Sequence, residues 1–399
     1  MKVTIEKLDH FGRGICYIND KICFVKEALP GEVVDIDITL ENKKYLEANI
    51  KKMIQKSSHR IKSPCKSFPE CGGCCFQHYS YEEENRYKKD KMIEIIDKFA
   101  HLDPKLVKDV ISSFEMNYRN KIILHGMGGK LGFYEEKTHS VIPIDECLLI
   151  SPRMNEIIKN LKSINVQILE ALIRSNNDDS MIMVELEGKV SDIELLKPYC
   201  DVLIYNGMIL TEQDEFISTI GSKKFYLSYS SFFQVNRFLT KDLYDAVLKV
   251  VKIKKPMKLL DLYCGTGTIG IYVSDYAKEI VGIDNNGSNI KDANKNKELN
   301  QVSSISFICD KVENQIDSFD KIDFIVVDPP RNGLDSKTVD SLLKINPETI
   351  VYVSCDPVTL ARDLNILKES YLIQYIQPFN MFPRSYHCES VCVLERRSN

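Results

Sequence analysis

A strand, a glycine-rich turn and the start of a helix follow one another in the stretch Lys258-Leu259-Leu260-Asp261-Leu262-Tyr263-Cys264-Gly265-Thr266-Gly267-Thr268-Ile269-Gly270. Glycines in such a turn let the backbone approach a ligand closely. The turn is not the complete dinucleotide fingerprint, because Thr268 and Ile269 precede Gly270. The next predicted strand ends in Asp284, about 20 residues further on, where a carboxylate can hold ribose hydroxyls. Together they indicate a nucleoside-containing cofactor; S-adenosylmethionine fits, and NAD is the alternative.

Strands and helices alternate from about residue 223 onward, which is typical of a doubly wound parallel sheet. Two of the later predicted strands lead into Asp328 and Cys355. Ligands and chemistry sit at the carboxyl ends of the strands in such sheets, so we expect both residues at the edge that binds the cofactor. Arg331 follows the two prolines after Asp328, where enzymes that methylate exocyclic amines carry a stacking aromatic. This arginine argues against amine chemistry.

The position of Cys355 allows two interpretations. A thiol at a strand end can be a nucleophile, but an ordinary cysteine has a pKa of about 8.5 and is mostly protonated at neutral pH. The alternative is a small core residue, since unpaired cysteine is among the most buried residue types. Glu389 begins a late predicted strand, a place that often borders an active cleft. A surface carboxylate is the alternative for Glu389.

The chain of 399 residues contains 13 cysteines. In a reducing compartment they are not expected to form a disulfide framework. Cys65, Cys71 and Cys74 lie close together, with two glycines before the last, which lets the backbone wrap a metal ion or cluster. Cys147 is the best candidate for a fourth ligand, and Cys75 is the local rival. The spacing does not separate zinc from an iron–sulfur cluster, and three unrelated buried cysteines are the alternative.

Short strands and turns alternate over residues 1–58, which predicts a five-stranded antiparallel barrel of the oligonucleotide-binding type. A hairpin is expected where residues 16–18 meet residues 22–25 across Asn19, Asp20 and Lys21. Residues 1–62 carry 12 Lys and Arg against 9 Asp and Glu, so this part is locally basic although the chain has a net charge of −4. RNA binding and a solubilising barrel for protein contacts are both open here.

The length of the chain predicts more than one domain. We expect the barrel at 1–58, a strand-rich central domain at 59–222 and the α/β domain at 223–399, with the helix of residues 80–104 free to pack on the last of these. The sequence contains no run of 18 apolar residues and no signal-peptide core. We therefore expect a soluble cytoplasmic protein without membrane contact.

The predicted helix has one apolar face and one basic run. The apolar face consists of Tyr87, Met92, Ile95, Ile96 and Phe99. A run of this kind more often faces solvent than phosphate, so we expect a solvated surface at the basic residues Arg86, Lys88, Lys89 and Lys91.

Taken together, these residues resemble the RNA uracil-C5 methyltransferase family over nearly the whole chain. The barrel resembles a TRAM domain, and the cysteine run with Cys147 resembles the four-cysteine [4Fe-4S] site of the branch that modifies bacterial 23S rRNA. The segment Ser231-Phe232-Phe233-Gln234-Val235-Asn236 resembles the family segment whose glutamine contacts S-adenosylmethionine. The resemblance implies a class I S-adenosylmethionine-dependent methyltransferase with a Rossmann-like parallel sheet, an N-terminal OB-like TRAM β-barrel and a β-rich central domain.

The resemblance also implies roles for individual residues. Cys355 matches the nucleophile and Glu389 the base. The implied cluster ligands are Cys65, Cys71, Cys74 and Cys147. The implied cofactor-binding residues are Gln234, Tyr263, Gly265, Thr268, Asp284 and Asp328.

The reaction explains why these groups are needed. Uracil C5 is too weak a nucleophile to take a methyl group unaided, but addition of Cys355 to C6 makes C5 enolate-like. Glu389 then removes the C5 proton and the thiolate leaves. The target base must also leave its stack, which accounts for the additional RNA-binding domains.

The expected partner is RNA, above all 23S rRNA, with no DNA, and the chain is expected to be a monomer. The cluster is expected to be structural, because RNA methylation needs no electron transfer. Two alternatives stay open: a tRNA 5-methyluridine methyltransferase with the same catalytic domain, and a non-catalytic RNA-binding module. The second would have been signalled by loss of Cys355 or Glu389, and both are present.

Overall fold

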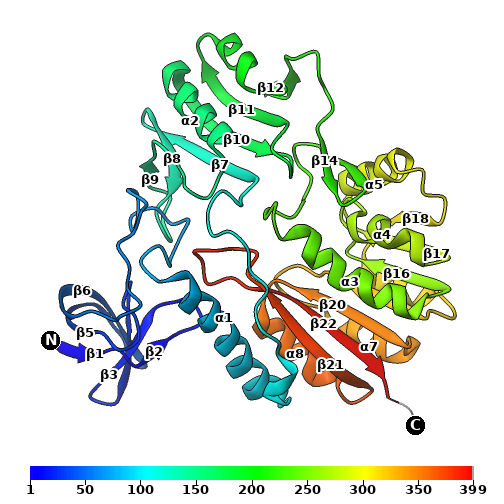
Figure 1. Ribbon diagram of the computed structural model, residues 1–399, viewed down its shortest axis with the longest axis horizontal. Coiled ribbons are helices and arrows are strands. Elements are labelled where there is room, and N and C mark those ends of the chain that lie inside the picture. Colours follow the sequence, from blue (N-terminus) through cyan, green and yellow to red (C-terminus); the bar gives the residue numbers. More distant parts are fainter. Residues whose placement is uncertain (398–399) are drawn as a thin grey trace.

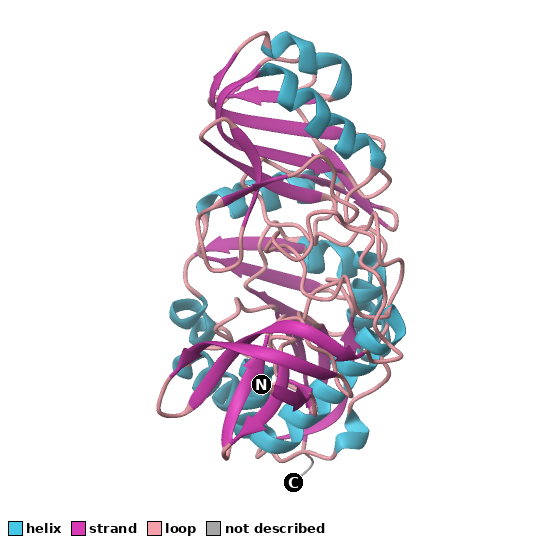
Figure 2. Cartoon of the chain, turned by 90° about the vertical axis from the view of Figure 1, so that its left-hand side faces the viewer, coloured by secondary structure: helices cyan, strands magenta, loops and turns pink. Residues whose placement is uncertain are grey.

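The computed structural model describes residues 1–397, except for the side chains of residues 165 and 166. Three large β-sheets form three lobes, seen in Figure 1 as the N-terminal lobe in blue, the central lobe in cyan to green and the C-terminal lobe in green to red. Figure 2 places the central lobe and the N-terminal lobe at opposite ends of the molecule. Among the described residues, no helix has the length and apolar character needed to cross a membrane.

The C-terminal sheet has seven strands in the order β18-β17-β16-β19-β20-β22-β21. The first five run parallel, whereas β22 is antiparallel to both β20 and β21. The strands are β16 (Lys258–Leu262), β17 (Glu279–Asp284), β18 (Ile305–Cys309), β19 (Phe324–Val327), β20 (Thr349–Ser354), β21 (Tyr371–Phe379) and β22 (Glu389–Arg396).

Apolar side chains cover both faces of this sheet, because neighbouring strand residues point to opposite sides. Leu259 packs in one core with α3 and α4, while Leu260 packs in another with α1, α7 and α8. The helices are α3 (Thr240–Lys254), α4 (Thr268–Val273), α5 (Gly287–Leu299), α6 (Val312–Gln315), α7 (Ser336–Ile345) and α8 (Pro357–Leu367), with short 3-10 turns η4 (Ser274–Tyr276) and η5 (Ile316–Ser318). The predicted doubly wound α/β fold is confirmed.

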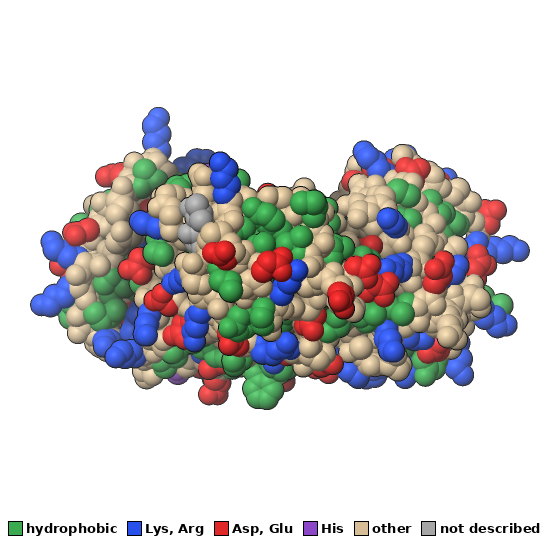
Figure 3. Space-filling view, turned by 90° about the horizontal axis from the view of Figure 1, so that it is seen from above, with side chains coloured by type: hydrophobic (Ala, Val, Ile, Leu, Met, Phe, Trp, Pro, Cys, Tyr) green, Lys and Arg blue, Asp and Glu red, His purple; other side chains and the backbone are tan. Residues whose placement is uncertain are grey.

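The central lobe is a mixed sheet in the order β13-β12-β11-β10-β7-β8-β9, packed against α2. Only the β11–β12 pair in it is parallel. Its elements are β7 (Lys121–Met127), β8 (Lys130–Tyr134), β9 (Val141–Pro143), α2 (Pro152–Ile164), β10 (Asn165–Ser175), β11 (Ile182–Val190), η3 (Ile193–Tyr199), β12 (Val202–Tyr205) and β13 (Met208–Ile209). A separate hairpin, β14 (Ile217–Ile220) with β15 (Lys223–Tyr226), leads into the C-terminal lobe. Figure 3 shows acidic and basic side chains intermixed on the face seen from above, which agrees with the near balance of charge.

The N-terminal lobe corrects the prediction of five antiparallel strands. It has six, in the order β1-β5-β6-β4-β3-β2, and the pair β4–β6 is parallel. The predicted hairpin forms, but its turn contains only Asn19 and Asp20, both with positive φ, so Lys21 pairs with Ile18 inside the ladder. Two residues with φ > 0 match the twist of a tight hairpin. The strands are β1 (Lys2–Thr4), β2 (Lys7–Leu8), β3 (Gly14–Ile18), β4 (Lys21–Val25), β5 (Val33–Glu41) and β6 (Tyr45–Gln55).

The predicted helix is α1 (Tyr81–Ile95), which continues as a π-helical turn, η1 (Ile96–Ala100), and is followed by the 3-10 turn η2 (Pro104–Leu106). Met92, Ile95 and Ile96 pack with α8 as part of the C-terminal core. Phe99 was expected on the same face but is 44% exposed. The wider π turn changes the residue spacing, so the face predicted from the α-helical period does not extend to Phe99.

The prediction of a solvated basic face is wrong for Lys88. Its side chain is fully buried, 2.9 Å from a carboxylate oxygen of Glu84. The Lys88 ammonium also donates to Asn380 Oδ1 at 2.5 Å and to the carbonyl of Phe382 at 3.0 Å. A buried charge of this kind requires such partners, and two of the three named here come from a segment almost 300 residues away in the sequence.

Candidate active site

The carboxyl edge of the C-terminal sheet brings together residues from five strands. Leu262 pairs with both Ile283 and Val327, so the residues that follow these positions share one edge. Cys355 comes directly after β20, in which Ser354 pairs with Ser390 of β22. Because β22 runs antiparallel, its first residue, Glu389, lies at the same edge as Cys355.

Glu389 is a buried carboxyl group, only 3% exposed, and not a surface carboxylate. Burial raises its pKa, the nearby Asp328 raises it further, and Arg331 opposes both effects. Burial also raises the pKa of Asp328. Two carboxyl groups in one desolvated place disfavour double ionisation, so the pair holds a proton more readily than isolated carboxylates do. Sequence reasoning missed Arg331 as the cation of this group.

Cys355 is half-buried beside the same carboxyl groups. Burial raises the pKa of its thiol to about 12, with smaller contributions from Glu389 and Asp328, whereas Arg331 lowers it. The thiol is therefore protonated at neutral pH in this arrangement, and it becomes reactive only when its proton is removed. The positive charge of Arg331 favours the thiolate.

The glycine-rich turn after β16 leaves room for a ligand. Gly265 has a φ of +53°, and a Cβ added to it would meet no atom within 4 Å. Asp284 accepts a hydrogen bond from the Gly265 N–H at 3.1 Å and another from the Asn286 N–H at 2.9 Å. Tyr263 also has a positive φ, 62°, which is uncommon for an aromatic residue. The predicted cofactor residues Tyr263, Gly265 and Asp284 thus lie together.

Thr268 and Gln234 are placed differently. The hydroxyl of Thr268 is 2.9 Å from the hydroxyl of Tyr244, so this side chain links α4 to α3. Gln234 is buried in the segment before α3, and its backbone carbonyl accepts a hydrogen bond from the side-chain amide of Asn120 at 3.1 Å. Asp292 of α5 holds the beginning of this segment through the hydroxyl of Ser231. Asp292 has no signal in the sequence that separates it from other helical acids.

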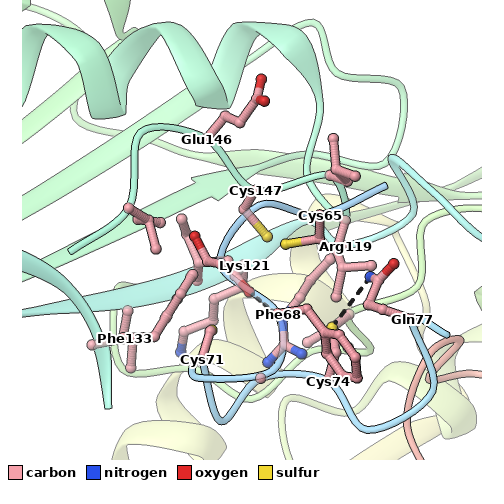
Figure 4. A pocket seen from close by; sticks show the side chains of 18 residues that line it. Cys65, Phe68, Cys71, Cys74, Gln77, Arg119, Lys121, Phe133, Glu146 and Cys147 are labelled. Atoms are coloured by element: carbon pink, nitrogen blue, oxygen red, sulfur yellow. Dashed lines mark hydrogen bonds between the residues drawn. The ribbon is translucent and has the colours of Figure 1, made fainter. Parts of the chain in front are cut away.

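A second group of predicted residues lies in the central region. Cys65, Cys71, Cys74 and Cys147 line one cavity of about 270 Å³, with Cys65 and Cys147 directing their sulfurs into it (Figure 4). The side-chain amide of Gln77 donates to the Cys74 sulfur at 3.5 Å. Burial raises the pKa of Cys74 to about 12 and that of Cys147 to about 11. Cys75 does not line this cavity.

Within residues 1–397, no group of three or more His, Cys, Asp or Glu side chains has the geometry for a single metal ion. The four thiols still suit an iron–sulfur cluster chemically, because each thiolate in a cluster binds a different iron, so the sulfurs stand farther apart than around one ion. A cluster would also replace the protons that these buried thiols otherwise keep.

A buried polar network connects the cysteine region to the active site. Both oxygens of the Glu84 carboxylate accept hydrogen bonds from the backbone N–H of Arg384, five residues before Glu389. The Arg384 guanidinium donates to the carbonyls of Phe76 and Tyr79 at 3.1 and 2.6 Å and pairs with Glu115. The cysteine segment also donates to Arg384, because the Cys75 N–H is hydrogen-bonded to the Arg384 carbonyl at 2.9 Å. None of these partners was predicted from sequence.

The sheet order and the glycine turn at its carboxyl edge define a class I S-adenosylmethionine-dependent methyltransferase. The solved structure of the Pyrococcus abyssi tRNA (uracil-54, C5)-methyltransferase in complex with S-adenosyl-L-homocysteine is similar over 99% of this chain and 100% of that one. The sequence identity is 25% and the TM-score is 0.83. This fold favours S-adenosylmethionine over the alternative of NAD.

Two family descriptions match the sequence: tRNA (Uracil-5-)-methyltransferase at residues 212–397 and TRAM domain at residues 1–51. An uncharacterised RNA methyltransferase of Halalkalibacterium halodurans is 31% identical, with 100% of this chain and 97% of the relative covered. One of Clostridium tetani is 33% identical, with 96% and 93% covered. The chain belongs to the RNA uracil-C5 methyltransferase family, and the predicted TRAM domain is confirmed.

Proposed function

We propose that this chain transfers a methyl group from S-adenosylmethionine to C5 of a uridine in 23S rRNA and so produces 5-methyluridine. The observation that carries the proposal is the meeting of Cys355 and Glu389 at neighbouring strand ends, fixed by the pairing of Ser354 with Ser390. The TRAM domain and the four-cysteine cavity support the ribosomal branch of the family.

Cys355 acts as the nucleophile in this proposal. After its proton passes to solvent, its sulfur forms a bond to C6 of the uracil ring, and the C5–C6 π electrons move toward the C4 carbonyl. C5 thereby becomes enolate-like and can accept a methyl group. S-adenosylmethionine, when bound, supplies that methyl group from its sulfonium. Arg331 assists because its charge favours the thiolate form of Cys355.

Glu389 acts as the base in the second half of the reaction. C5 then carries both the methyl group and its original proton, and Glu389 takes that proton. The electrons of the C–H bond restore the C5–C6 double bond, and the Cys355 thiolate leaves C6. Burial makes the Glu389 carboxylate a stronger base than an exposed glutamate, provided that it enters the step ionised.

The cofactor site in this proposal consists of residues at the sheet edge and the segment before α3. The space at Gly265 admits a ligand next to the Asp284 carboxylate, which can accept hydrogen bonds from ribose hydroxyls. The bound S-adenosyl-L-homocysteine of the Pyrococcus abyssi relative supports the same cofactor class here. The proposed contacts are Gln234, Tyr263, Gly265, Thr268, Asp284 and Asp328, with Thr268 contributing its backbone, because its hydroxyl faces Tyr244.

The four cysteines of the central cavity are proposed to hold a [4Fe-4S] cluster. The residues would be Cys65, Cys71, Cys74 and Cys147. Their role is structural, since methyl transfer involves no oxidation or reduction, and the cysteine segment is hydrogen-bonded to the segment before Glu389.

A tRNA substrate is the second candidate. It is favoured by the Pyrococcus abyssi relative, a tRNA (uracil-54, C5)-methyltransferase that shares the fold over 99% of this chain. The reaction at Cys355 and Glu389 would be the same. Which of the two RNAs is methylated then depends on the contacts that the RNA makes with the N-terminal and central lobes.

The deciding experiment offers unmodified 23S rRNA and unmodified tRNA separately, with labelled S-adenosylmethionine, and identifies the product nucleoside by mass. We expect 5-methyluridine in the ribosomal RNA alone. Label in tRNA alone would keep the mechanism and replace the substrate. No label in either RNA, from protein that binds the cofactor, would remove the catalytic proposal and favour a non-catalytic RNA-binding module.

A further inference from the structure

A groove of about 200 Å³ adjoins the cysteine cavity, with which it shares Cys71 and Cys74 as walls. It lies between the N-terminal lobe, the cysteine segment and the segment before Glu389. Its volume is several times the roughly 30 Å³ that one water molecule occupies in the liquid, so it admits more than ordered solvent. Side chains from three distant parts of the sequence form its walls. They include Phe11, Arg13 and Glu27 from the N-terminal lobe, Phe68 from the cysteine segment, and Tyr386 and His387.

Aromatic rings dominate one side of the groove. The ring centroids of Phe11 and Tyr386 are 5.5 Å apart at an interplanar angle of 85°, and those of Tyr386 and His387 are 4.2 Å apart. Phe11 nevertheless stays 52% exposed, although it belongs to a cluster of rings. An aromatic face that stays open beside other rings is suited to stacking with a planar ligand.

The charges around the groove are balanced. The Arg13 guanidinium is bound to Asp9 at 2.8 Å and to Glu47 at 3.0 Å, so the N-terminal lobe already neutralises it. Glu27, in contrast, forms no ion pair among residues 1–397, and its half-buried carboxylate faces the groove as a hydrogen-bond acceptor. A neutral planar group with N–H donors suits such walls better than a phosphate does.

The groove adjoins the active site. Tyr386 and His387 precede Glu389 by three and two residues. Arg331 and Asp356, which both act on the pKa of the Cys355 thiol, act on the pKa of the Tyr386 hydroxyl as well. A strand of RNA whose target base enters the site at Cys355 therefore has its neighbouring nucleotides within reach of the groove.

We propose that this groove is a nucleobase-binding subsite that takes one unstacked base of the RNA strand beside the target uridine. Phe11 provides the stacking surface, Tyr386, whose ring is nearly perpendicular to it, closes the side of the subsite, and Glu27 accepts a hydrogen bond from the edge of the base. The inference rests on the proposed function, because it needs an RNA strand at the active site. Sequence-specific RNA recognition commonly uses splayed bases on aromatic side chains in this way.

The test compares Phe11→Ala with Tyr17→Ala. Both aromatic residues are 52% exposed on the same lobe, but Tyr17 does not line the groove. The probe is whichever unmodified RNA the wild type methylates. Loss of one stacked base costs about 1–3 kcal/mol, so Phe11→Ala should raise Kd and KM roughly 5- to 150-fold with kcat unchanged. Tyr17→Ala should stay within about twofold of the wild type.

Two conservative variants and the salt dependence sharpen the test. Phe11→Trp should bind RNA as the wild type does, whereas Phe11→Leu, which keeps apolar bulk, should resemble Phe11→Ala. The slope of log Kd against log salt should stay unchanged, because a base contact releases no counterions. Unchanged RNA affinity in Phe11→Ala overturns the subsite, as does wild-type affinity in Phe11→Leu or a slope smaller by about one.

Failure of the subsite and failure of the proposed function look different. A wild-type protein that methylates neither RNA contradicts the proposed function. A wild-type protein that methylates RNA while Phe11→Ala behaves like Tyr17→Ala contradicts only the subsite. Equal melting temperatures of the two variants show that neither result comes from unfolding.

Discussion

The sheet edge around Cys355 and the cavity around Cys74 both bury thiols, but with different neighbours. Cys355 has three carboxyl groups, those of Glu389, Asp328 and Asp356, and one arginine near it. Cys74 shares a cavity with three other cysteines and a set of apolar side chains, including Ile122 and Phe133. Burial raises the pKa of both thiols to about 12. Burial alone therefore does not identify a reactive thiol; the neighbouring groups and the position at a strand end do.

The two regions are also mechanically connected. The backbone N–H of Cys75 is hydrogen-bonded to the carbonyl of Arg384, and the backbone N–H of Arg384 is hydrogen-bonded to the carboxylate of Glu84. The cysteine segment, α1 and the segment before Glu389 therefore form one hydrogen-bonded unit. A change in the cysteine region is thus expected to reach the active site through structure, without altering the chemistry of Cys355.

The largest difference between the two regions should appear when Cys355 is replaced by alanine. Loss of a covalent nucleophile commonly costs on the order of 10⁴-fold or more, so methylation should fall to background. RNA binding should be kept, because the thiol contributes little contact area. Cys309 is the last residue of β18 and is exposed, so it also lies at the carboxyl edge of the sheet. Cys309→Ala is therefore the matched control and should retain activity. Equal methylation by the two variants would contradict the role of Cys355.

The connection between the regions can be broken at Lys88. Lys88→Met removes the nearer of the two cations beside the buried Glu84 and leaves only the Arg384 guanidinium, 4.0 Å away. Breaking a buried ion pair typically costs about 3–5 kcal/mol, and the loss should be visible in thermal and urea unfolding. Lys89→Met removes a neighbouring lysine whose partner, Asp109, is exposed, and should change stability by no more than about 0.5 kcal/mol.

A double variant separates charge from packing at this position. Glu84→Gln together with Lys88→Met removes both charges, while the glutamine oxygen can still accept a bond from the Arg384 N–H. It should recover much of the lost stability. A single Lys88→Met variant as stable as Lys89→Met would show that the network does not hold the two regions together.

The cavity itself is tested by comparing Cys74 with its neighbour Cys75. Cys74→Ser should lose most of the bound iron, whereas Cys75→Ala should keep it, since Cys75 does not line the cavity. A ligand present at a free concentration of 100 times its Kd contributes about 2.7 kcal/mol of stability, so Cys74→Ser should also melt at a lower temperature. The measurements are iron per chain and melting temperature in anaerobically purified protein. Equal iron in both variants would remove Cys74 from the ligand set.

Local patterns predicted the residues of the C-terminal sheet edge well. Asp284, Asp328 and Cys355 each follow a short apolar run, and a parallel sheet necessarily collects such strand ends at one edge. Glu389 was the exception that required topology: it begins its strand, and it reaches the same edge only because β22 is antiparallel. Nothing in the local sequence specifies that reversal.

The predictions failed where distant segments decide the environment. Lys88 lies in a basic run whose helical pattern looks solvated, and only contacts with Glu84 and Asn380 show that it is buried. Phe99 was assigned to the buried face by a regular period that the π turn interrupts. In the N-terminal lobe the parallel pairing of β4 with β6 could not be inferred, because strand composition does not encode which strands meet.

The smallest predicted effect concerns Arg331, the cation near Cys355. Arg331 lowers the pKa of both Cys355 and Glu389, so Arg331→Met should raise both pKa values. The thiolate and the carboxylate then need a higher pH to form, and the rising limb of kcat/KM against pH should move upward by about one unit, equivalent to about 1.4 kcal/mol. Arg331→Lys keeps the charge and should leave the limb nearly in place. If both variants lose activity equally at every pH, Arg331 acts through contact with the substrate and not through the pKa of Cys355.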